Sequence, residues 1–180
     1  MVDDASEQDW LYPHHHFDFI HTRVMLGAFT DFSQVIRNAF RYTKPGGWME
    51  CQEIYPTPFC DDGTMPQDWP FLDWSRTQDL AFMKLDRPLR IANKLKRWFE
   101  EAGFVDVHEE VFRVPLNAWP RDAYMKDIGR LHLLSLLDGL QGFSIAPFSR
   151  AFGWSANEVE VYLINVRKAM QDRSVHAYLK

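Results

Sequence analysis

The stretch FDFIHTR, from Phe17 to Arg23, ends in two residues that can take part in chemistry, His21 and Arg23. The apolar residues around them predict a short buried strand, and ligands of open α/β sheets bind outside the carboxyl ends of the strands. An imidazole can accept a proton near neutral pH, and a guanidinium can hold a carboxylate or an enolate oxygen. His21 is therefore a candidate general base and Arg23 a candidate anchor. The structural alternative is that His21 caps a backbone group and Arg23 pairs with an acid.

A second set of polar residues follows in the stretch WMECQEI. Successive residues of a strand point to opposite faces, so Trp48, Glu50 and Gln52 share one face, where they are candidate substrate contacts. Glu50 is unusual for a buried strand and requires a partner. Glu53 lies nearer the carboxyl end and is a candidate catalytic acid. A structural ion pair, for instance with Arg23, is the alternative.

Two further residues, Trp74 and His132, are candidate substrate contacts. His132 follows Ile128 on an apolar helical face, where a buried histidine with a satisfied hydrogen bond is the alternative. Trp74 belongs to an aromatic cluster that forms either a lid over an apolar ligand or part of the core. The cluster consists of Trp69, Phe71, Trp74 and Phe82.

The run of three histidines at positions 14–16 does not predict a metal site. Consecutive residues of a short turn cannot all reach one ion, and no acidic or cysteine partner has zinc-like spacing. Cys51 and Cys60 lack a base partner, which argues against a thiol nucleophile. Two cysteines also make no disulfide framework, so we expect an intracellular protein without a metal.

The N-terminal part of the chain predicts a parallel β-α-β unit. Apolar residues recur at helical spacing from Phe32 to Phe40, with Asp31 placed as the N-cap and Gln34 as its partner. The run PGG at positions 45–47 ends that helix before the second strand. A strand, a helix and a strand of these lengths favour a right-handed parallel crossover.

The rest of the chain predicts mainly helices. Helical periodicity, a glycine after one helix and a capping box before another support these assignments. The third predicted helix is apolar nearly all round, so we expect it to be buried. The predicted helices are residues 71–85, 88–102, 121–140 and a last one that begins with the capping box Ser155–Glu158; the predicted strands are residues 104–116 and 175–180.

Bulk composition excludes several classes of protein. The 180 residues suffice for one domain with a core, and 46% of them are hydrophobic, which excludes general disorder. The net charge of −5 and the lack of a basic patch argue against nucleic acid as a partner. No apolar run is long enough to span a membrane, and the acidic N-terminus is unlike a secretory signal.

Four stretches occur in a specific order: VDDASEQDWLYPHHHFDFIHTRVMLGAFTDF, KPGGWMECQEI, EEAGFVDVHEEVFRVPLNAWP and GWSANEVEVYLINVRKAM, the last followed by HAY. Together they resemble the LaeA-like group of fungal S-adenosylmethionine-dependent methyltransferase-like proteins, which is associated with secondary metabolism. The resemblance covers nearly the whole chain. It implies an α/β fold, a truncated Rossmann-like class I methyltransferase sheet with a helical cap. It also implies a single domain over residues 1–180, with cap or lid helices in residues 55–87 and 117–172.

The departure from the family pattern is on the cofactor side. The family fold is a seven-stranded doubly wound sheet, and this chain is expected to start just before the fourth strand. The first three strands, the glycine-rich turn and the acidic ribose residue have no counterpart. Asp3 and Asp4 match a family position near the adenine ring, either as vestigial contacts or as a polar terminus.

These observations predict a methyltransferase-derived biosynthetic enzyme that has lost binding of S-adenosylmethionine. We expect cyclisation, isomerisation or proton transfer on an apolar small molecule. Two alternatives are a methyltransferase subunit or fragment that another chain completes, and a non-catalytic interaction protein. The chain alone is expected to bind no cofactor, and S-adenosylmethionine only when a partner completes the site.

The first predicted strand also suggests an assembly. Its edge from Phe17 to Thr22 would face the missing half, and it is apolar with no proline or lysine to discourage pairing. We therefore expect a homodimer or a hetero-oligomer formed through this edge.

Overall fold

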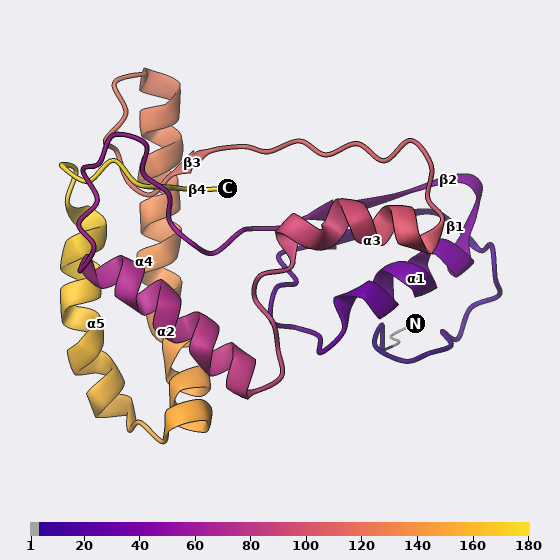
Figure 1. Cartoon of the computed structure of the whole chain (residues 1–180), viewed down its shortest axis with the longest axis horizontal. Helices are drawn as coiled ribbons and strands as arrows, with labels where there is room; N and C mark the ends of the chain where they lie inside the picture. The colour runs from indigo at the N-terminus through magenta and orange to yellow at the C-terminus, as the bar shows by residue number, and fades with distance from the viewer. Residues whose placement is uncertain (1–3) are drawn as a thin grey trace. The chain divides into compact units, whose positions relative to one another are not determined.

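The computed structural model describes residues 4–180, which fold as two compact units. The first unit extends to Tyr55 and resumes from Arg87 to Glu110, and the second comprises Pro56–Asp86 and Val111–Lys180. Figure 1 labels the elements of both units along the chain. Asp3, one of the two predicted adenine-side residues, lies outside the described residues.

The first unit is built on a parallel β-α-β unit, as the sequence predicts. Strand β1 (Phe17–Arg23) leads through helix α1 (Phe32–Tyr42) into strand β2 (Thr43–Gln52), and the two strands pair in parallel. Helix α1 packs against α3 (Leu95–Ala102), which follows the short 3-10 helix η1 (Ala92–Lys94). The core of this unit consists of Phe32, Val35, Ile36, Ile91 and Phe99.

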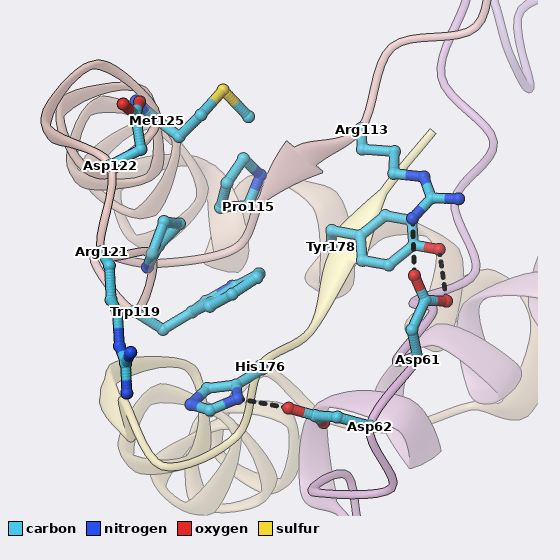
Figure 2. Close-up of a pocket in the computed structure, with 11 residues that line it drawn as sticks. Asp61, Asp62, Arg113, Pro115, Trp119, Arg121, Asp122, Met125, His176 and Tyr178 are labelled. Carbon is cyan, nitrogen blue, oxygen red and sulfur yellow. Dashed lines mark hydrogen bonds and ion pairs between the residues drawn. The ribbon is translucent and has the colours of Figure 1, made fainter.

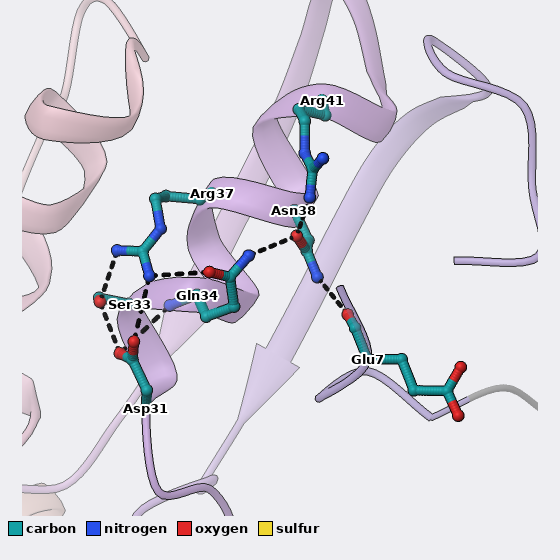
Figure 3. Close-up of polar contacts among 7 residues, drawn as sticks. All are labelled: Glu7, Asp31, Ser33, Gln34, Arg37, Asn38 and Arg41. Carbon is teal, nitrogen blue, oxygen red and sulfur yellow. Dashed lines mark hydrogen bonds and ion pairs between the residues drawn. The ribbon is translucent and has the colours of Figure 1, made fainter. Parts of the chain in front are cut away.

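Polar side chains secure the start and the outer side of helix α1. The Asp31 carboxylate accepts a hydrogen bond from the Gln34 amide, as predicted for an N-cap, and Arg37 binds the same carboxylate at 3.1 Å. Farther along, the buried Asn38 donates to the Glu7 carbonyl at 2.6 Å and accepts from Arg41 (Figure 3). These bonds tie the segment before β1 to the helix.

Two sequence predictions for the first unit need correction. The sequence predicts β1 to be a buried strand, but Phe19 on β1 and its partner Trp48 on β2 are 55% and 68% exposed. Helices α1 and α3 lie on one face of the strand pair, and these two side chains lie on the opposite face. The α-helix expected to start at Pro88 begins only at Leu95, after the 3-10 helix that starts at Ala92, since the Pro88 carbonyl instead accepts a hydrogen bond from the Gly27 amide. Gly103 ends α3 with φ of 109°, as a glycine at that position predicts.

The second unit is largely helical. Helices α2 (Pro70–Lys84), α4 (Ala123–Phe152) and α5 (Ala156–Gln171) pack on one another, and the predicted capping box at Ser155 is present. Two short strands, β3 (Val114–Pro115) and β4 (Tyr178–Leu179), pair antiparallel. Fully buried side chains in this unit include Leu140, Phe148, Val159, Leu163 and Met170.

Two further predictions fail in the second half of the chain. Only Val114 and Pro115 of the strand expected over residues 104–116 are extended in a ladder, since a strand requires a paired neighbour and only β4 supplies one. The expected 121–140 helix continues to Phe152 and is not buried all round, because Leu131 and Leu134 are 68% and 56% exposed. None of the described helices is both long and apolar enough to cross a membrane.

Helix α4 supplies a matched test of its packing. Gly129 lies against residue 117, and an added Cβ would come 2.7 Å from the Asn117 carbonyl carbon and 3.1 Å from the Pro115 Cβ. We therefore expect Gly129→Ala to lower the free energy of unfolding by about 1–3 kcal/mol through overpacking.

The control is Gly142→Ala in the same helix, where an added Cβ meets nothing within 4 Å. Alanine is the better helix former, so this variant should be more stable by up to about 1 kcal/mol. Urea unfolding of both variants checks the pair, and equal effects would contradict the packing assigned to Gly129.

Candidate functional site

Four polar side chains form a quartet on the exposed face of the β1–β2 pair. His21 is the register partner of Glu50, and Arg23 is the partner of Gln52. Residues two apart in a strand share a face, so all four belong to the side away from the core, and all four are exposed. The sequence placed Glu50 and Gln52 on one face, and the pairing of the strands adds His21 and Arg23 to it.

Hydrogen bonds join three members of the quartet. His21 Nδ1 lies 2.9 Å from Glu50 Oε2, and Gln52 Nε2 donates to Glu50 Oε1 at 3.0 Å. The bond from Gln52, and after it the bond from His21, lowers the pKa of the Glu50 carboxyl. A carboxylate at Nδ1 requires a proton on that nitrogen, so the other ring nitrogen, Nε2, is left as the hydrogen-bond acceptor in neutral His21.

Two aromatic rings lie beside the quartet on the same face. Phe19 and Trp48 are register partners, one step before His21 and Glu50 on that face. The Phe19 ring stacks on the His21 imidazole with centroids 6.1 Å apart and planes at 27°. The predicted substrate contact Trp48 therefore adjoins the predicted base and supplies apolar surface next to it.

Arg23 is the quartet member with no assigned contact. Among the described residues it makes no hydrogen bond or ion pair with Glu50 or Glu53. An exposed guanidinium at the last residue of β1 can bind an anionic or polar group of a ligand.

Glu53 lies apart from the quartet, although the sequence grouped it with His21 and Arg23. Its carboxylate accepts hydrogen bonds from the Met25 amide at 2.8 and 3.1 Å and from the Leu26 amide at 3.2 Å. Burial raises the pKa of this carboxyl, and the two amide bonds oppose the rise. These contacts fix the turn after β1, and they replace the ion pair with Arg23 that the sequence left open.

Neighbouring Cys51 lies in surroundings that disfavour a thiolate. Thr22 Oγ1 donates to its sulfur at 3.1 Å, and burial raises the pKa of the thiol to about 12. The thiolate required of a nucleophile is therefore disfavoured, in agreement with the sequence argument.

The remaining predicted contacts lie in the second unit and have structural partners. Trp74 is buried, and its indole N–H donates to Ser144 Oγ at 2.9 Å. Trp69 and Phe71 are buried with it, so this part of the aromatic cluster belongs to the helical core rather than to a lid. A substrate contact at Trp74 stays a prediction.

His132 and Asp4 are likewise engaged locally. His132 Nδ1 lies 2.9 Å from the Pro115 carbonyl, and burial lowers the pKa of the imidazole against the opposing effect of this bond. Asp4 accepts hydrogen bonds from the amide and hydroxyl of Ser6, which form a local turn. The adenine and substrate roles of these residues stay predictions.

Sequence reasoning missed one polar site altogether. In the second unit, Asp62 and His176 meet in a hydrogen bond beside a cavity of about 340 Å³ (Figure 2). The two residues are 114 positions apart; His176 opens the stretch HAY of the family resemblance, whereas Asp62 lies in none of the stretches that carry it. The turn-forming run CDDGT around Asp62 and the stretch HAY at residues 176–178 were the sequence signals near it, and neither indicates that the two segments meet.

Comparisons with known proteins agree with the sequence resemblance. The sequence profile of the family described as Methyltransferase domain matches residues 2–109. The methyltransferase pytC of Aspergillus terreus is 33% identical over 177 residues, which is 98% of this chain and 54% of that protein. The secondary metabolism regulator LAE1 of Cochliobolus heterostrophus is 34% identical over 174 residues, 96% of this chain and 57% of that protein.

A further relative matches with similar identity and coverage. The probable methyltransferase tdiE of Emericella nidulans is 33% identical over 180 residues, 99% of this chain and 56% of that protein. The chain thus spans about half the length of the curated relatives it matches. A solved structure of phosphoethanolamine N-methyltransferase 2 from Haemonchus contortus aligns with a TM-score of 0.45 and 15% identity, over 98% of this chain and 34% of that one.

The contact of His132 predicts a pH dependence of stability. Because the pKa of His132 is lowered in the folded state, the unfolded state binds more protons as the pH falls through the ordinary histidine range. The free energy of unfolding should therefore decrease from about pH 8 to about pH 5.5. His132→Asn, whose amide can still donate to Pro115, should show a smaller decrease. Urea unfolding of both proteins across this pH range checks the prediction. If the free energy of unfolding decreases equally in the unsubstituted chain and in His132→Asn, His132 is not a buried neutral imidazole.

Proposed function

Because this chain belongs to the methyltransferase-domain family, in its LaeA-like fungal group, we propose that it forms the acceptor-binding side of an S-adenosylmethionine-dependent methyltransferase of secondary metabolism. The relatives named methyltransferase align with nearly the whole chain, which supports this choice over a donor-free enzyme. The profile match and the parallel β-α-β unit confirm the Rossmann-like α/β fold class.

The observation that carries the proposal is the bond between His21 and Glu50. Glu50 orients the imidazole through Nδ1 and leaves Nε2 as the hydrogen-bond acceptor of the neutral ring on the exposed face. Such a nitrogen can remove the proton from a hydroxyl or amine of an acceptor molecule, and Glu50 then stabilises the imidazolium that forms. Arg23 would hold an anionic or carbonyl oxygen of the acceptor, and Trp48 would contact its apolar body.

Residues 4–180, the part of the chain that the structure describes, do not by themselves fit the methyl donor. An anionic group such as the carboxylate of S-adenosylmethionine can be held by free backbone N–H groups in a glycine turn that leads from a strand into a helix. In the turn from β1 to α1, the amides of Met25 and Leu26 are bound by Glu53, and that of Gly27 is bound by Pro88. Gly46 and Gly47 lie within β2, which directly follows helix α1, so they are not in a turn that leads from a strand into a helix.

We therefore propose that a further polypeptide segment or chain supplies the donor side. Within the described residues β1 pairs only with β2, so the edge from Phe17 to Thr22 has no strand partner on its other side. Phe19 and Trp48 are large exposed apolar side chains on the adjoining face. An unpaired edge and an exposed apolar patch are both typical of interaction surfaces.

A donor-independent cyclisation, isomerisation or proton-transfer enzyme is the other expectation from the sequence, and it stays a prediction. Turnover of an acceptor by the chain in the absence of S-adenosylmethionine would favour it. A homodimer through the Phe17–Thr22 edge also stays a prediction. Such a dimer would not complete the donor site, because a second copy repeats the same side of the sheet and brings no glycine turn for the donor.

Binding of the donor is the first test. Isothermal titration of the chain alone with S-adenosylmethionine should give a dissociation constant no tighter than about 1 mM. A fusion in which this chain replaces the matched 177 residues of Aspergillus terreus pytC should bind the donor in the micromolar range. Micromolar binding by the chain alone would contradict the need for completion, and a folded fusion without binding would contradict the methyltransferase proposal.

Substitution of His21 is the second test. In the fusion, His21→Ala should lower methyl transfer to small phenols and alcohols at least about tenfold, because general bases typically contribute about 10²–10⁴-fold. Both partners are exposed, so the melting temperature should hardly change.

His108→Ala is the matched control, since His108 is exposed and lies outside the quartet. It should leave transfer and melting unchanged. If His21→Ala instead melts earlier and keeps its activity per folded molecule, the His21–Glu50 bond is structural.

A further inference from the structure

The cavity in the second unit has an apolar body and a polar rim. Pro115, Pro120 and Met125 line it together with the aromatic rings of Trp119 and Tyr178. The polar residues around them are Asp61, Asp62, Arg113, Arg121, Asp122 and His176 (Figure 2). A volume of about 340 Å³ is at the lower end of the range for small-molecule sites, enough for a single-ring compound.

The orientation of His176 at this rim is fixed from several sides. Its Nδ1 lies 2.5 Å from Asp62 Oδ2, and its backbone amide donates to Thr64 Oγ1 at 2.9 Å. The Trp119 indole stacks on the imidazole with centroids 4.9 Å apart and planes at 26°. Figure 2 shows the other ring nitrogen, Nε2, on the side away from Asp62.

The Asp62 carboxylate is itself immobilised. It accepts hydrogen bonds from the Thr64 amide at 3.1 Å, the Thr64 hydroxyl at 2.8 Å and the Cys60 thiol at 3.2 Å. The bond with His176, followed by those from Thr64 and Cys60, holds the pKa of Asp62 well below its usual range. With Nδ1 bound to Asp62, His176 can donate through Nε2 only as the imidazolium, a form attracted both by the Asp62 carboxylate and by a second anion placed at Nε2.

The acids around the cavity are all engaged, whereas one cation is not. Asp61 binds Arg113 at 2.5 Å and the Tyr178 hydroxyl at 2.9 Å. Asp122 caps α4 by accepting from the Met125 amide at 2.9 Å. Arg121 makes no hydrogen bond or ion pair with the described residues. Figure 2 shows its guanidinium on the same side of the cavity as His176 Nε2.

We propose that this cavity binds a small aromatic carboxylate, held by Arg121 and His176 Nε2 and packed against Trp119. A guanidinium and an imidazolium can each donate to a carboxylate oxygen, and an indole face offers a planar ring a stacking partner. Two hydrogen-bonding residues suit a monoanion better than a phosphate dianion, which requires more hydrogen-bond donors. None of these residues belongs to the quartet on β1 and β2, so the site is independent of the proposed methyl transfer.

Isothermal titration of the full chain with benzoate tests the proposal, with benzamide as the uncharged isostere and inorganic phosphate as the bare anion. Benzoate should bind with a dissociation constant below about 1 mM, and both comparison compounds should bind at least about tenfold more weakly. Benzamide or phosphate binding as tightly as benzoate would overturn the proposal, and so would the absence of benzoate binding.

Two variants localise the binding. Arg121→Gln and Asp62→Asn should each weaken benzoate binding at least about fivefold, the second because an asparagine can still accept from Nδ1 but no longer supplies the negative charge that favours the imidazolium of His176. Arg130→Gln is the control, since Arg130 is an exposed arginine on α4 that pairs with Asp127 outside the cavity. Arg121 is exposed and its substitution should leave melting unchanged, so benzoate affinity unaltered in Arg121→Gln contradicts the site directly.

Discussion

The register between β1 and β2 decides which side chains can meet in the first unit. With Phe19 opposite Trp48 and His21 opposite Glu50, one face carries every polar member of the quartet and the other packs under the helices. A shift of one residue would turn these side chains to the opposite face. The turn after β1 helps to hold that register, because Glu53 beyond β2 accepts hydrogen bonds from Met25 and Leu26 just beyond β1.

The second unit depends on a comparable constraint between distant segments. The buried Asn117 side chain donates to the carbonyls of Met170 and Asp172 at 3.0 Å each, which ties the segment after β3 to the end of α5. Trp119 lies two residues after Asn117 in the chain, and its indole N–H donates to the Ala177 carbonyl at 2.9 Å. These bonds bring His176 to Trp119 and so build the rim of the cavity.

Local patterns in the sequence were sufficient for much of the fold. The N-cap at Asp31, the capping box at Ser155 and the glycine at position 103 each depend on contacts within a few residues, and all three are present. The shared face of Glu50 and Gln52 follows from the period of a strand alone. The family resemblance rested on several such stretches in order, and the profile match confirms it.

What the sequence could not supply were the partners across long separations. The valines and phenylalanines of residues 104–113 are typical of a strand, yet no described strand pairs with these residues, so they remain without a ladder. From the sequence, Glu53 is an acid at the end of a strand. Only the path of the turn after β1 shows that its carboxylate accepts hydrogen bonds from the amides of Met25 and Leu26. Nothing in the sequence around Asp62 or in the stretch HAY indicates that Asp62 and His176 meet, so only the fold of the second unit brings them together.

The central claim is that Glu50 acts by orienting His21 as a base. A double-mutant cycle on methyl transfer by the pytC fusion, with His21→Ala, Glu50→Gln and the double variant, tests it most directly. If the two residues act as a unit, the double variant will be no slower than His21→Ala, because Glu50 has nothing left to orient. Strictly additive losses, or an unchanged rate in Glu50→Gln, would contradict the account.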